Sequence, residues 1–142
     1  MHSINRERII ELMNEVEKAL YKLRKLRNIE ENEFFSDFKN IDAAKYNFIL
    51  AIEACIDICN HIVTKLAKRI PKDYADCFKI LNEIGLIKDQ EFVYRLMNMA
   101  RFRNILVHFY WKVEDERLFK ILKENLKDIE IFLEIIKQSY LV

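Results

Sequence analysis

The sequence predicts an all-α protein, an antiparallel bundle of about five helices that forms one domain over residues 1–142. Apolar residues recur at spacings of three and four along nearly the whole chain, which is the period of a helix with one buried face. The chain contains one glycine and one proline, whereas β-rich folds and folds with many tight turns need far more of both. The same scarcity excludes a glycine-rich phosphate-binding loop.

The first part of the chain predicts two long helices. The first runs from about residue 4 to about residue 28, where apolar residues keep the helical spacing. Residues 29–40 are acidic and aromatic, and we expect a connection with one helical turn there. Asn40 or Asp42 is expected to cap the second long helix, since both side chains accept hydrogen bonds from free backbone N–H groups. Pro71 marks the end of that helix, because proline cannot continue it.

The rest of the chain predicts three shorter helices. Gly85 closes the third in a left-handed conformation, and the fourth frays near His108. Several of the helices carry apolar stripes wide enough for an interface, so we expect a homodimer. The residues that open the three helices are, in order, Asp73, Asp89, and either Glu114 or Asp115.

Charge and cysteine content limit the classes of function. Lys and Arg number 24 against 23 Asp and Glu, a net charge of +1, so any contact with nucleic acid must come from a local basic patch. An odd number of cysteines without a Cys-x-x-Cys pair favours buried free thiols and a reducing cytoplasm. Because no segment is apolar enough for a signal peptide or a membrane span, we expect a cytoplasmic protein. The cysteines are Cys55, Cys59 and Cys77.

The segment 92–113 carries the residues best suited to chemistry. It contains no Asp or Glu, four basic residues and a single histidine, His108, near the end of the fourth predicted helix. Histidine transfers protons near neutral pH, and arginine stabilises negative charge on a reacting phosphate. A cation, an imidazole and the amide of Asn104, without a metal ligand set, suit a phosphodiester substrate. The aromatic residues expected to stack on bases are Phe102, Phe109, Tyr110 and Trp111.

Helical geometry places these groups on two faces. Asn104 and His108 are four residues apart and share a face, and Arg101 lies on nearly the same stripe. Arg103 precedes His108 by five residues, so its Cα vector points ~140° away. A long guanidinium covers only part of that angle. The two side chains could converge more easily if the helix loosens near His108, and they could also meet as copies from two subunits.

A polar stripe on the second long helix allows two interpretations. Glu53, Asp57 and His61 recur every fourth residue and could together chelate a metal ion. We favour a supporting role without metal, in which Glu53 or Asp57 pairs with Arg101 or Arg103 and fixes its conformation.

Arg103, His108 and Tyr110 form an Arg-x4-His-x-Tyr motif that resembles the signature of HepT-like proteins, members of the HEPN superfamily. The resemblance extends from about Ala43 to about Leu122. The flanking segments that match the family pattern are Ala51–His61, the third-helix residues Tyr74, Phe78, Leu81 and Gly85, and Met99–His108.

The resemblance implies a homodimeric toxin that cleaves RNA as a metal-independent endonuclease, without a cofactor, in a cleft that the two subunits share. Its partner would be a small antitoxin of the minimal nucleotidyltransferase (MNT) type. Arg103 would stabilise the transition-state phosphate, and His108 would act as general acid or base for attack by the ribose 2′-hydroxyl. Asn104 and Arg101 would orient the substrate. Tyr110 would accept AMP from the antitoxin, which silences the nuclease by adding negative charge and bulk.

Two other functions stay open on the sequence. The same cationic cleft could belong to a non-catalytic regulatory module that binds a nucleotide or the nucleotidyltransferase. Alternatively, the chain could be a helical scaffold in which His108 only interacts with the negative end of its helix. Growth arrest on expression, relieved by His108→Ala, would distinguish the toxin from both.

Overall fold

The computed structural model describes residues 3–142, which form seven α-helices and one 3₁₀ turn and contain no strand. The predicted all-α class is confirmed. None of these helices combines the length and the apolar character that crossing a membrane requires. The elements are α1 (Arg6–Arg27), α2 (Glu31–Ser36), α3 (Phe38–Leu66), α4 (Tyr74–Glu83), α5 (Gln90–His108), the 3₁₀ turn η1 (Tyr110–Lys112), α6 (Asp115–Glu124) and α7 (Leu126–Tyr140).

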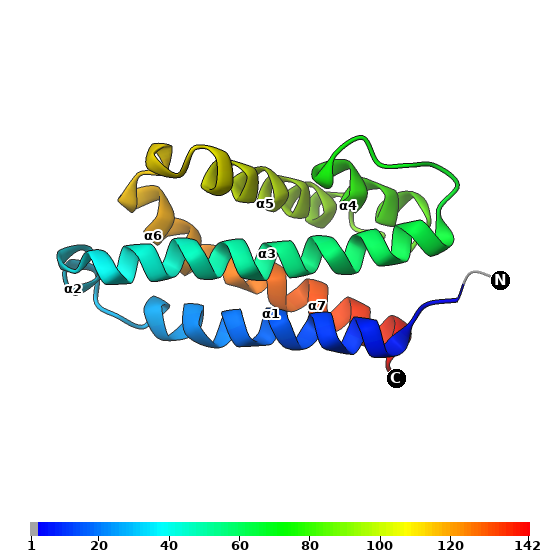
Figure 1. Ribbon diagram of the computed structural model, residues 1–142, viewed down its shortest axis with the longest axis horizontal. Helices are drawn as coiled ribbons and strands as arrows, with labels where there is room; N and C mark the ends of the chain where they lie inside the picture. The colour runs from blue at the N-terminus through cyan, green and yellow to red at the C-terminus, as the bar shows by residue number, and fades with distance from the viewer. Residues whose placement is uncertain (1–2) are drawn as a thin grey trace.

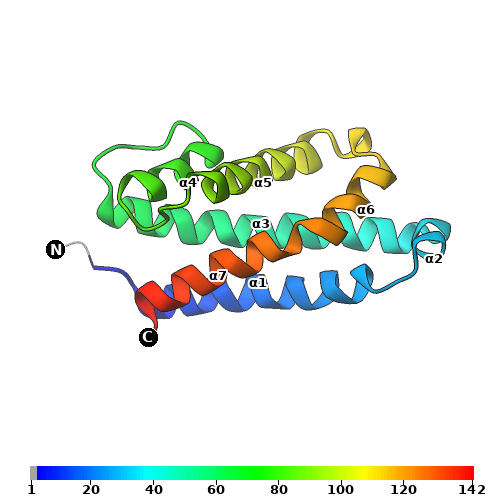
Figure 2. The same cartoon turned by 180° about the vertical axis from the view of Figure 1, so that it is seen from behind.

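The long helix α3 is the centre of the bundle. It lies between α1 on one side and α5 on the other, and α4 packs beside α5 near the end of α3 (Figure 1). Helices α6 and α7 cross the opposite side of the α1–α3 pair, as the reverse view shows (Figure 2). Every other helix contributes to one core around α3, and the short α2 does so through the fully buried Phe34.

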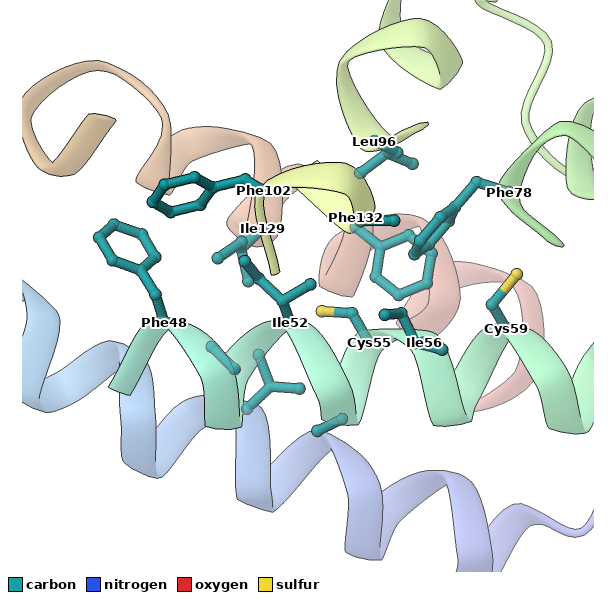
Figure 3. Packing of buried hydrophobic residues seen from close by; sticks show 14 of the residues in the cluster. Phe48, Ile52, Cys55, Ile56, Cys59, Phe78, Leu96, Phe102, Ile129 and Phe132 are labelled. Carbon is teal, nitrogen blue, oxygen red and sulfur yellow. The ribbon is translucent and has the colours of Figure 1, made fainter. Parts of the chain in front are cut away.

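The core is built from apolar side chains that the helical spacing singles out. Phe48 of α3 meets Phe102 of α5 edge to face with ring centres 5.6 Å apart, and Phe78 of α4 meets Phe132 of α7 in the same way at 5.6 Å (Figure 3). These contacts tie α3, α4, α5 and α7 together. The three cysteines are free and buried, as predicted, and burial raises the pKa of the Cys55 thiol.

Several predicted helix ends are confirmed. The Asp73 carboxylate accepts the backbone N–H of Asp76 at 2.7 Å and opens α4. The Asp89 carboxylate likewise opens α5. Gly85 follows α4 with a φ of 83°, a left-handed conformation that glycine adopts without a steric penalty. Local capping chemistry thus fixes both ends of the α4–α5 connection.

The bounds predicted for the second long helix are wrong at both ends. Its cap is Asp37, which accepts the N–H of Lys39 at 2.9 Å, so Asn40 and Asp42 lie inside the helix. The helix also ends at Leu66, five residues before Pro71. The segment after Leu66 turns toward α4 because the guanidinium of Arg69 binds the carboxylates of Asp76 and Glu83 at 2.7–2.9 Å.

The last predicted helix is two helices, α6 and α7, which meet at Asn125. The N–H of Asn125 closes α6 on the carbonyl of Ile121 at 2.8 Å, while its side chain donates to Asp128 at 3.3 Å. Asparagine favours such local bonds over a continuing helix. The break turns α7 so that the buried Asp128 accepts a hydrogen bond from Arg95 of α5 at 3.1 Å.

Substitution of Arg95 by Met is expected to lower the free energy of unfolding by about 1–3 kcal/mol, because it leaves the Asp128 carboxylate buried with one partner fewer. Urea unfolding of both proteins measures the difference. Lys127→Met, an exposed change on α7, is the control and should shift the value by less than about 0.5 kcal/mol. Equal effects of the two substitutions would contradict a stabilising role for the Arg95–Asp128 pair.

Candidate functional site

His108 is the last residue of α5 and is exposed. The helix stops there because Phe109 leaves the helical conformation (φ −138°, ψ 47°), although its N–H still bonds the carbonyl of Ile105 at 2.8 Å. Within residues 3–142, the imidazole of His108 makes no hydrogen bond and no ion pair. The imidazole thus stands at the surface without a partner among the described residues.

Arg103 lies on the inner side of α5 and is held in place. Its guanidinium forms an ion pair with Glu53 of α3, donates to the Asn104 side-chain oxygen at 3.2 Å, and lies 5.3 Å from the ring centre of Tyr74. The Arg103 side chain is only 13% exposed. Of the two carboxylates expected as partners, Glu53 is therefore the one that pairs with Arg103. Asp57 is exposed and makes no ion pair with any other described residue.

The structure does not bring Arg103 and His108 together within one chain. The contacts of Arg103 reach α3 and α4, whereas His108 points to solvent. Because α5 stays helical through His108, it does not loosen in a way that would turn Arg103 toward the imidazole. The loosening that would ease convergence is therefore not seen in this helix, and a meeting of the two residues across two copies of the chain stays a prediction.

The exposed face of α5 nevertheless gathers three of the predicted polar groups. Arg101 is exposed and donates to the side chain of Asn98 at 2.9 Å. Asn104 is half-buried and touches Arg103, and it shares its face of the helix with His108. A cation, an amide and an imidazole therefore line one stripe, and the amide links that stripe to the buried arginine.

Tyr110 has two partners on α3 that the sequence analysis did not connect with it. Its hydroxyl donates to the carboxylate of Asp42 at 3.2 Å, and the Lys45 ammonium donates to its backbone carbonyl at 3.2 Å. Burial, together with the neighbouring charge of Asp42, raises the pKa of Tyr110 to about 12. No sequence signal joins these residues, because Asp42 and Lys45 precede Tyr110 by 68 and 65 positions.

The expected stacking surface is smaller than the sequence suggests. Phe102 is buried against Phe48 and cannot stack on a base, because its position on α5 faces α3. Phe109, Tyr110 and Trp111 are exposed, and Trp111 most of all, at 74%. Of the four residues expected to stack on bases, the three that follow His108 therefore remain available.

The stripe of Glu53, Asp57 and His61 does not act as a ligand set here. Glu53 binds Arg103, and the His61 Nε2 atom accepts the backbone N–H of Asn5 at 3.0 Å. In the part of the chain that the structure describes, no three His, Cys, Asp or Glu side chains lie close enough to hold a metal ion. Burial lowers the pKa of His61 and raises that of Asp57.

One cavity lies away from the motif. It measures about 170 Å³ and is lined by residues of α3, α5, α6 and α7, among them Phe48, Phe102 and Asp128. Its α5 residues occupy the face of Phe102 rather than that of His108. The cavity therefore does not extend to the exposed stripe of Arg101, Asn104 and His108.

Comparison with known proteins matches residues 7–136 to the family described as ribonuclease HepT-like. The mRNA nuclease HepT of Shewanella oneidensis is 34% identical over 106 residues, which cover 75% of this chain and 79% of that protein. A toxin–antitoxin crystal structure with AMP-PNP matches with a TM-score of 0.83 and 28% identity, over 93% of this chain and 98% of that one. The tri-AMPylated HEPN toxin of Shewanella oneidensis, in complex with its MNT antitoxin, matches with a TM-score of 0.84 and 29% identity, over 92% and 97%.

Replacing Glu53 by Gln is expected to lower the free energy of unfolding by about 1–2 kcal/mol, because the largely buried guanidinium of Arg103 loses its charged partner. The matched control on the same helix is Asp57→Asn, which removes a carboxylate without an ion pair and should change stability by less than about 0.5 kcal/mol. Denaturant unfolding near neutral pH compares the two. A larger loss for Asp57→Asn than for Glu53→Gln would show that Arg103 depends on Asp57 instead.

Proposed function

The chain belongs to the ribonuclease HepT-like family, and on that premise we propose that it is the toxin of a toxin–antitoxin pair, a metal-independent endoribonuclease that needs no cofactor. RNA is its substrate, and a minimal nucleotidyltransferase is its antitoxin. The observation that carries this proposal is the free imidazole of His108 on the same stripe as Arg101 and Asn104, with Arg103 bonded to the side chain of Asn104.

The proposed reaction uses the ribose 2′-hydroxyl as nucleophile. One base removes its proton, the 2′-oxygen forms a bond to the neighbouring phosphorus, and the 5′-oxygen leaves with a proton from an acid. His108 acts as general acid or base in this sequence, a role suited to an exposed imidazole near neutral pH. Arg103 stabilises the negative charge that develops on the phosphate oxygens, and Arg101 and Asn104 orient the strand.

The active unit is a homodimer in this proposal. Within one chain Arg103 and His108 diverge by ~140° around α5, so the motif of a second copy has to complete the site. The surface beside His108 suits such a contact. Val107, Phe109 and Trp111 are 40%, 46% and 74% exposed, and an apolar cluster of this kind on a protein surface is typical of an interface or a ligand-binding face.

Tyr110 is the proposed site of silencing. It follows His108 by two residues, and the residue is 37% exposed. One structural relative is described as a tri-AMPylated toxin bound to its antitoxin, and we assign the AMP acceptor of this chain to Tyr110. Phosphates attached there add negative charge and bulk beside the cationic stripe, which opposes the entry of RNA.

The purified protein is expected to cleave RNA in the presence of EDTA. Arg103→Ala and His108→Ala should each lower the cleavage rate at least about 100-fold, since each removes a group that acts in the transition state. His108→Ala should melt close to the wild-type temperature, whereas Arg103→Ala should stay folded but melt a few degrees lower, because it also breaks the ion pair with Glu53. Lys120→Ala, an exposed change on α6, serves as the control. Activity that EDTA abolishes and zinc or magnesium restores would reject the metal-free reaction. An inactive protein that binds the nucleotidyltransferase would instead support the regulatory module.

Co-purified heterodimers of the two inactive variants test the shared site. If Arg103 of one copy works with His108 of the other, a dimer of one Arg103→Ala chain and one His108→Ala chain keeps one intact site and about half of the wild-type rate. If both residues act within the same chain, the mixed dimer is as inactive as either variant. Two different affinity tags allow the mixed dimer to be isolated before its RNA cleavage is measured.

A further inference from the structure

The hydroxyl of Tyr110 is bonded to a residue outside the Arg-x4-His-x-Tyr motif. It donates a hydrogen bond to Oδ1 of Asp42 across 3.2 Å. Asp42 lies near the start of α3 and is exposed, so solvent can reach its carboxylate. The tyrosine oxygen therefore has a carboxylate as its immediate neighbour.

Lys45 holds the tyrosine in that position. Its side chain comes from the next turn of α3, on the same face as Asp42, and the residue is only 6% exposed. Its ammonium donates to the Tyr110 carbonyl at 3.2 Å and lies 4.3 Å from the centre of the Tyr110 ring. A buried ammonium that binds both the backbone and the ring fixes η1 on α3.

Transfer of AMP to a tyrosine requires that the phenol loses its proton. Burial and the charge of Asp42 hold the pKa of Tyr110 at about 12, so the hydroxyl stays protonated near neutral pH. A group that accepts the hydrogen bond of a hydroxyl is already at the distance from which it can take the proton. Among the described residues, Asp42 is the side chain that bonds this hydroxyl.

We propose that Asp42 is the proton acceptor for the transfer of AMP to Tyr110 and that Lys45 is the positioning residue for this step. The inference rests on the proposed function, in which Tyr110 is the AMP acceptor. The Tyr110 oxygen forms a bond to the α-phosphorus of a nucleoside triphosphate held by the nucleotidyltransferase. The bond from that phosphorus to the pyrophosphate oxygen breaks, and pyrophosphate leaves with the electron pair. The phenol proton passes to the Asp42 carboxylate and then to solvent.

The test measures the first AMP added to the toxin under single-turnover conditions. The purified chain is mixed with an MNT-type nucleotidyltransferase, ATP and magnesium, and the intact mass is followed over time. Asp42→Asn keeps the size of the side chain and an oxygen that accepts a hydrogen bond, but it cannot take a proton. We expect it to slow the transfer about 100-fold or more. Asp42→Glu, which restores a carboxylate, should recover part of the rate.

The pH profile separates proton transfer from a structural effect. The charged groups that contact Tyr110 are Asp42 and Lys45 on α3, and the titratable or charged residues next to it in the chain are His108 and Lys112. With Asp42 as acceptor, the wild-type rate should be nearly level from pH 6 to 9. In Asp42→Asn the phenol must ionise first, so its rate should rise about tenfold per pH unit below the pKa of the tyrosine. Glu116→Gln, an exposed substitution on α6, is the control for both measurements.

Three results would overturn the inference. If Asp42→Asn is modified at the wild-type rate with the wild-type pH profile, the proton acceptor belongs to the nucleotidyltransferase, and the proposed function is unaffected. If both Asp42→Asn and Asp42→Glu unfold at lower temperature than Glu116→Gln and lose the rate equally, the carboxylate acts only on structure. If Tyr110→Phe gains AMP as fast as the wild type, Tyr110 is not the acceptor, and the silencing part of the proposed function fails as well.

Discussion

The packing of α5 against α3 is the constraint from which the rest of the site follows. The edge-to-face contact of Phe48 with Phe102 is part of the packing that turns this face of α5 toward α3. With that rotation fixed, Arg103 must face α3, where Glu53 supplies the opposite charge that a largely buried guanidinium requires. His108 must then face solvent. The packing of α5 on α3 thus leaves Arg103 in an ion pair and His108 exposed.

This arrangement gives the two motif residues different properties. Arg103 is rigid, because an ion pair, the Asn104 side chain and the face of the Tyr74 ring hold its guanidinium. His108 has no such contacts and sits at the last residue of a helix, beside exposed aromatic side chains. A cation that is already held in position can stabilise developing negative charge without first rearranging. Histidine in general is a residue suited to proton transfer near neutral pH. Both properties suit phosphodiester cleavage, and both depend on α3.

Much of the fold could be predicted from the sequence, because helix periodicity and capping are local. Asp73, Gly85 and Asp89 act within one turn of their own position, and the structure confirms each of them. The start of α3 differs for a local reason, since Asp37 rather than Asn40 or Asp42 caps it, whereas two other differences involve contacts between elements. The segment after α3 is held by the ion pair of Arg69 with Asp76 of α4. The break at Asn125 places Asp128 of α7 where it accepts a hydrogen bond from Arg95 of α5. Asp128 follows Arg95 by 33 positions, beyond the window that a periodic pattern covers, and the Arg69–Asp76 pair, seven positions apart, is a charge contact that hydrophobic periodicity does not report.

For the candidate site, the sequence by itself determined the residues of the motif and the ~140° that separates Arg103 from His108, because both follow from the order of residues on one helix. Only the tertiary structure decided that Glu53 rather than Asp57 pairs with Arg103, that Phe102 is buried, and that Asp42 bonds the hydroxyl of Tyr110. These contacts join elements 50 or more residues apart. They depend on how each helix rotates in the core, and that rotation is set by the packing of all its neighbours together.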